Sequence, residues 1–136
     1  MTTTTLTKTA RTLIAASTSN GAGSTTEGTP LDLRTANGGI ITGKVANGAT
    51  GPTAQAIMQV LIAHNDGSTP AGGAEGANWK LIAEISPGTA NNAVARIPGL
   101  PIDAGVQHVH VRVTGNTGQA VTCEAFFSEI TSAASA

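Results

Sequence analysis

The residues best suited to chemistry gather near the end of the chain, in a stretch that reads VQHVHVRV, TGNTGQA and VTCEAFFSEI. This stretch contains the single cysteine, Cys123, two of the three histidines, His108 and His110, and Glu124. A thiol beside an imidazole can act as a nucleophile, and two imidazoles with a carboxylate can bind zinc. Either chemistry requires these side chains to lie on the same face of the strands that carry them.

Both halves of this stretch alternate between apolar and polar residues, which predicts two β-strands joined by a turn at Gly115–Gly118. If the strands pair as a hairpin, partner numbers sum to about 234, and Val111 lies opposite Cys123. The thiol then lies in the core and both imidazoles lie on the open face, so no catalytic pair is expected. The open face becomes a candidate contact surface, formed by His108, His110, Arg112, Glu124 and Phe126.

His108 and His110 are also the strongest metal candidates, together with Glu124, which the predicted register places opposite His110. Residues two apart on a strand project to the same side. A zinc site additionally needs a fourth ligand or an open position, and outer groups that orient the ligands. Histidines facing solvent or an interface are the commoner case, so we expect no metal, no cofactor and no catalytic residue.

Two further motifs resemble functional sites. Residues 38–45, GGIITGKV, nearly match a phosphate-binding loop, but they lack the following Ser or Thr and alternate like a strand. Trp79 could be a platform for a sugar ring, but it is in phase with Leu81 and Ile85, which favours a core position. The carboxylates are scattered along the chain and suggest no paired site for glycoside hydrolysis.

Composition limits the classes of partner. Charged residues make up 11% of the 136 residues, aromatic residues 2%, and the net charge is -1, whereas ordinary domains are about 25% charged. Nucleic-acid binding is disfavoured because it needs clustered Lys and Arg. The N-terminal sequence is not a convincing secretory signal, and the apolar run at 56–63 is too short to cross a bilayer. So little surface charge favours a surface covered by partners.

The chain as a whole predicts an all-β protein with a single antiparallel β-sandwich. About eight short strands are separated by turns, a pattern typical of both jelly-roll and Ig-like folds. We expect the sandwich to span residues 9–131, with a flexible Thr-rich arm at residues 1–8 and a flexible tail at residues 132–136.

Four segments occur in an order that resembles small β-sandwich virion proteins of tailed bacteriophages. They are NDGS (65–68), NWKLIAEI (78–85), IPG (97–99) and VRV-TGNTG-VTCEA (111–125), and the resemblance covers roughly residues 54–131. An insertion, TPAGGAEGA, separates NDGS from the tryptophan in this chain. The resemblance implies a structural protein of the virion, assembled in the host cytoplasm, with no catalytic residues.

Within that class, the resemblance favours a protein that decorates or cements the capsid by binding the major capsid protein. By analogy we expect a symmetric homo-oligomer, a trimer. A ring component of the neck or tail is the alternative within the virion. A carbohydrate- or surface-binding β-module is the alternative outside it, which an exposed Trp79 would favour and a buried one would count against. An enzyme ranks third.

Overall fold

The computed structural model describes residues 4–64 and 67–135, and all of the regular structure in this part of the chain is β. The strands in chain order are β1 (Thr4–Asn20), β2 (Thr26–Glu27), β3 (Leu31–Asp32), β4 (Gly39–Asn47), β5 (Ile57–Ala63), β6 (Lys80–Ile85), β7 (Val94–Ile102), β8 (His108–Thr114) and β9 (Val121–Ser135).

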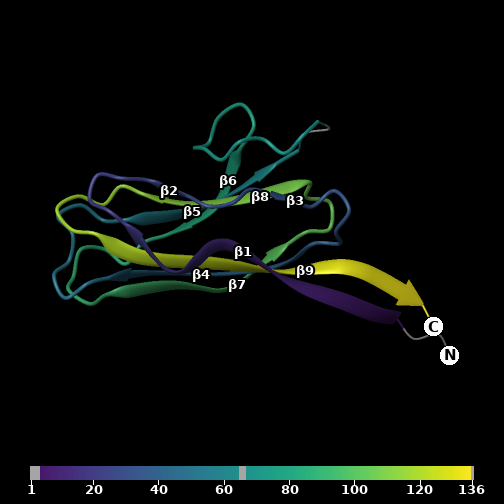
Figure 1. Cartoon of the computed structure of the whole chain (residues 1–136), viewed down its shortest axis with the longest axis horizontal. Helices are drawn as coiled ribbons and strands as arrows, with labels where there is room; N and C mark the ends of the chain where they lie inside the picture. Colours follow the sequence, from purple (N-terminus) through teal and green to yellow (C-terminus); the bar gives the residue numbers. More distant parts are fainter. Residues whose placement is uncertain (1–3, 65–66, 136) are drawn as a thin grey trace.

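The strands form two antiparallel sheets that pack face to face (Figure 1). Sheet A has the order β1-β9-β4-β7, and sheet B has the order β2-β8-β5-β6, with β3 also paired to β8. Alternate residues of both sheets enter one shared core, which includes Ile41, Val60, Val111 and Phe127. The predicted antiparallel β-sandwich is therefore confirmed.

The pairing pattern identifies the sandwich as a jelly roll. Both β2 and β3 pair with β8, so they act as one interrupted strand and reduce the nine strands to eight. The first strand, β1, then pairs with the last, β9. The strands between them also pair from the outside inward: β2/β3 with β8, β4 with β7, and β5 with β6. A chain folded back on itself in this way, with its pairs distributed over two sheets, has the double-sheet topology of a jelly roll.

The predicted β8–β9 hairpin is wrong, although its apolar face is correct. Strand β8 pairs with β2, β3 and β5 in sheet B, whereas β9 pairs with β1 and β4 in sheet A. The valines of β8 and the alternate residues of β9 from Val121 to Phe127 are buried because they face one another across the core. Alternation reports which side of a strand is buried, and strands in opposite sheets bury their sides just as hairpin partners do.

The connection between β8 and β9 crosses from one sheet to the other and is anchored by Asn116, which is fully buried. The Asn116 amide donates hydrogen bonds to the carbonyl oxygens of Asn20, at 3.1 Å, and Gln119, at 3.0 Å. The Asn20 amide donates to Asn116 Oδ1 at 2.6 Å. The crossing is thus joined to the end of β1 in sheet A.

The first and last strands of the sandwich extend into the segments next to the two ends of the described chain. Residues 4–8 belong to β1 and residues 132–135 to β9, and the two segments pair in an antiparallel ladder from Thr4–Ser135 to Lys8–Ile130. Thr is β-branched and favours strands, which suits the Thr-rich start of β1 to this pairing. Residues 1–3 and 136 lie outside the described residues.

Candidate functional site

The face of β8 that the sequence predicts to be open is covered. His108 and His110 are both fully buried although they point away from the main core. They lie on the outer face of sheet B. On the neighbouring strand β5, Ala63 is the partner of His108 and Leu61 is the partner of His110. The two histidines are therefore not available as a contact surface, contrary to the prediction.

The cover over this face comes from the long loop between β5 and β6, whose residues 67–79 stand outside the upper sheet in Figure 1. Trp79, only 3% exposed, forms a second apolar cluster with Leu61 and Ala63. Its indole N–H donates to the carbonyl oxygen of Ala71 at 2.8 Å. This hydrogen bond anchors the loop to the buried indole. The indole ring lies 5.2 Å from the ring of His110, at an angle of 42°.

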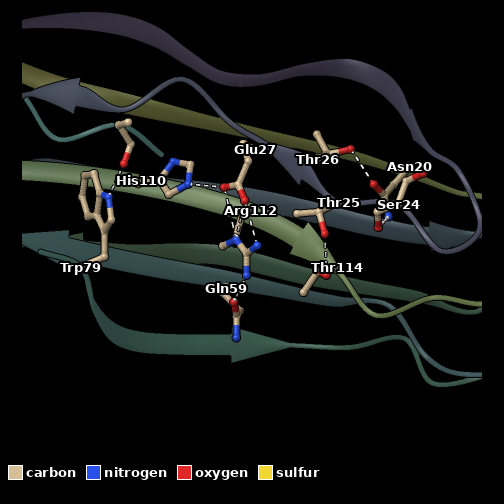
Figure 2. Close-up of polar contacts among 11 residues, drawn as sticks. Asn20, Ser24, Thr25, Thr26, Glu27, Gln59, Trp79, His110, Arg112 and Thr114 are labelled. Atoms are coloured by element: carbon tan, nitrogen blue, oxygen red, sulfur yellow. Dashed lines mark hydrogen bonds and ion pairs between the residues drawn. The ribbon is translucent and has the colours of Figure 1, made fainter. Parts of the chain in front are cut away.

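Glu27 of β2 binds two side chains of β8, the strand beneath this cover. Figure 2 shows a row of side chains that runs from Trp79 through His110, Glu27 and Arg112 to Gln59. His110 Nε2 lies 2.7 Å from Glu27 Oε2, and the Arg112 guanidinium lies 2.8 Å from Glu27 Oε1. Arg112 also donates to Gln59 Oε1 at 3.2 Å. Glu27 thus ties β2 to β8, and through Arg112 to β5.

The electrostatics of this row favour a neutral imidazole and an ionised carboxylate. Burial lowers the pKa of His110 and outweighs the opposite effect of Glu27. Burial alone would raise the pKa of Glu27, but hydrogen bonds from Arg112 and His110 together outweigh it and lower that pKa. A neutral His110 that donates from Nε2 to an ionised Glu27 satisfies both preferences.

The residues predicted to form one metal or contact site lie on two faces. Glu124 is on β9, on the outer face of sheet A, where its carboxylate pairs with Lys44 at 3.2 Å. The core of the sandwich lies between it and the histidines. Among the described residues, no group of three His, Cys, Asp or Glu side chains could hold a metal ion. The error follows from the β8–β9 pairing, which the predicted hairpin placed within one sheet.

Cys123 is in the core, on the opposite side of sheet A from Glu124. Burial raises the pKa of its thiol to about 11. A thiol with so high a pKa is a weak nucleophile, because the thiolate is the reactive form. The prediction that Cys123 and the histidines lie on opposite sides of β8 and β9 holds, since the imidazoles are outside sheet B and the thiol is inside the sandwich.

The outer face of sheet A is different, because nothing in the described chain covers it. Ile40 and Val94 are each nearly half exposed there. A shallow depression of about 250 Å³ opens on this face between β4, β7 and β9. Its lining includes Thr42, Lys44, Arg96, Pro98, Glu124 and Phe126.

Sequence reasoning found two of the residues that line this depression and missed the others. Glu124 and Phe126 are among the predicted contact residues, but Lys44 and Arg96 are not. Lys44 belongs to the segment that resembles a phosphate-binding loop, and the structure places residues 39–45 of that segment in strand β4, as its alternation predicts. Lys44 lies opposite both Glu124 and Arg96 in the register of sheet A. Only the strand order brings these residues together.

Comparisons with known proteins show the fold and no family. No protein family and no curated protein matches this sequence. The SPBc2 prophage-derived protein YomS is 20% identical over 91% of this chain and 95% of its own, with a TM-score of 0.44. A structure of infectious bursal disease virus, Gx strain, is 10% identical over 91% of this chain and 32% of its own, with a TM-score of 0.51.

A family 22 carbohydrate-binding module of Clostridium thermocellum Xyn10B is 13% identical over 96% of this chain and 85% of its own, with a TM-score of 0.41. At such identities the comparisons support a β-sandwich and nothing finer. No helix capable of crossing a membrane occurs in the described part of the chain.

Proposed function

We propose that this chain is a non-enzymatic structural protein of a bacteriophage particle, which decorates or cements the capsid through contacts with the major capsid protein. The class rests on the order of the NDGS, NWKLIAEI, IPG and VTCEA segments, which resembles that of small virion sandwiches. The observation that carries the proposal is the contrast between the two outer faces. The part of sheet B around His108 and His110 is covered by the chain's own loop, whereas sheet A presents uncovered apolar and charged side chains.

The chemical groups of the chain support an inert role. The thiol is in the core, and the two histidines of β8 are fully buried. Trp79 is buried as well, which counts against its use as a sugar platform. The thiol, the two imidazoles and the indole considered from the sequence are therefore enclosed within the fold.

A second feature that fits attachment is the ribbon formed by residues 4–7 of β1 and 132–135 of β9, visible at the N- and C-terminal end of Figure 1. Strand β4 begins at Gly39, opposite Glu129, so its ladder with β9 does not extend along this ribbon. A two-stranded ribbon alone is marginally stable in water. A neighbouring subunit that pairs with either edge would stabilise it.

The test is to measure the copy number of the chain in purified particles of the phage that encodes it. Quantitative mass spectrometry against the major capsid protein should give a ratio of the order of one copy per capsid subunit or per capsomer. A small fixed copy number would instead indicate a ring at the neck or tail. Absence from particles would overturn the virion proposal. Native mass spectrometry of the free protein tests the expected trimer.

A further inference from the structure

We propose that the depression on the outer face of sheet A is the docking point for a protein segment that presents a carboxylate beside an apolar side chain. This inference rests on the proposed function, because it assigns the face and the chemistry by which a particle subunit would bind its neighbour.

The apolar part of the site is Phe126 with Pro98. Phe126 is on β9, opposite Thr42 of β4, and Pro98 is on the edge strand β7. Strand β9 alternates, so Phe126 points outward while its neighbours Ala125 and Phe127 enter the core. A half-buried aromatic ring in a depression of about 250 Å³ is suited to receive one apolar side chain.

The charged side chains of the site, two cations and one carboxylate, carry a net positive charge. Lys44 and Glu124 neutralise each other at 3.2 Å. The side chain of Arg96 also lines the depression, and within residues 4–64 and 67–135 it forms no hydrogen bond or ion pair. One positive charge therefore remains uncompensated beside the Phe126 ring, on a chain whose net charge is -1.

A carboxylate is the group that best complements this charge. The planar guanidinium of Arg binds a carboxylate through two parallel hydrogen bonds. Recognition of a nucleic-acid backbone would need a series of unpaired cations, whereas the second cation here, Lys44, already has a partner. The combination of one free guanidinium with an adjacent apolar surface specifies an acidic residue next to an apolar one.

The experiment maps peptide binding on the ¹⁵N-labelled full chain by NMR. The probe is a capped pentapeptide with phenylalanine beside glutamate, and the matched peptides replace glutamate by glutamine or phenylalanine by serine. We expect the first peptide to shift the amides of Thr42, Lys44, Arg96 and Phe126, and each matched peptide to bind about tenfold more weakly, a loss of about 1.4 kcal/mol.

Variants of the protein test the same site from the other side. Arg96→Gln should weaken binding of the acidic peptide about tenfold, because it removes the charge-assisted bond. Lys80→Gln, which removes a positive charge from sheet B, should leave binding unchanged. Equal binding of the glutamate and glutamine peptides, shifts located away from the depression, or an unaffected Arg96→Gln variant would overturn the proposal. So would equally strong binding of an oligoglucuronate at the same amides.

Incorporation into particles separates this inference from the proposed function. If Arg96→Gln is incorporated as well as the wild-type chain, the docking inference fails and the virion role stands. If the wild-type chain is absent from particles but binds the acidic peptide at Arg96, the virion role fails and the docking site stands.

Discussion

The outer faces of sheet A and sheet B are built from the same kind of alternating strand, yet a loop of the chain covers part of sheet B and leaves sheet A open. On sheet B, two histidines and an indole are enclosed by the β5–β6 loop and by Glu27. On sheet A, Phe126 and Arg96 line an open depression. The difference shows that a polar residue on a strand need not face solvent, since a loop from elsewhere in the chain can cover it.

The strongest test of this comparison removes one aromatic ring from each face. Trp79→Ala should lower the free energy of unfolding by about 3–5 kcal/mol, because it empties the second apolar cluster and releases the loop. Phe126→Ala should cost about 1 kcal/mol or less, because the ring is partly exposed. Urea denaturation of both variants measures the two losses. Equal losses would show that the two faces are equally packed.

A subtler test adds one methyl group to the cover. A Cβ at Gly72 would lie 2.8 Å from His110 Cε1 and 3.0 Å from Nε2, so Gly72→Ala should destabilise the fold by about 1–3 kcal/mol. At the neighbouring Gly73, a Cβ would have no atom within 4 Å, so Gly73→Ala is the matched control and should be neutral or slightly stabilising. Thermal unfolding distinguishes the two, and a neutral Gly72→Ala would contradict the close packing.

The covered face should also make stability depend on pH. Because the pKa of His110 is lowered in the folded state, the unfolded chain takes up the proton first as pH falls below about 6.5. Stability should therefore be complete above that pH and decrease below it. Glu27, whose pKa is also lowered, should add a further loss below about 4.5. Denaturation of wild type and His110→Gln across this range should show a difference that changes with pH, and a constant difference would contradict the assignment.

The smallest effect is expected from the ion pair on the open face. Lys44 and Glu124 are about a quarter to a third exposed, at 33% and 24%. A double-mutant cycle with Lys44→Gln and Glu124→Gln should give a coupling energy of about 0.2–1 kcal/mol, and less at high salt. A coupling energy of several kcal/mol would mean that this face is far less solvated than its exposure indicates.

The sequence predicted burial better than it predicted pairing. Val109, Val111, Cys123 and Ala125 are buried as expected, because a period of two in the sequence directly reflects the two sides of a strand. The same pattern contains no information on which strand lies alongside. The partners of β8 and β9 are set by the jelly-roll topology, in which strands far apart in the sequence pair with each other.

The cover of sheet B was not predictable for a different reason. It comes from residues 67–79 and from Glu27, both in segments whose Gly, Ser and Thr content is typical of loops. Two signals were present: the Gly72-Gly73 pair, which permits close approach to a ring, and the isolated Trp79 that follows it. Neither signal identifies His110 as the ring that the loop covers, because Gly72 and His110 are nearly forty residues apart in the sequence.

The order of strands in sheet A also has a consequence for synthesis. Strand β9 lies between β1 and β4, although it is made after both. While the ribosome is still adding residues 121–130, β1 and β4 have no central strand to join them, and Phe127 has not reached the core. The sheet can therefore close only after this segment has emerged, so completion of folding must follow its translation. Nascent chains that stop before Val121 would expose two unpaired strand edges, which are recognisable to chaperones and proteases.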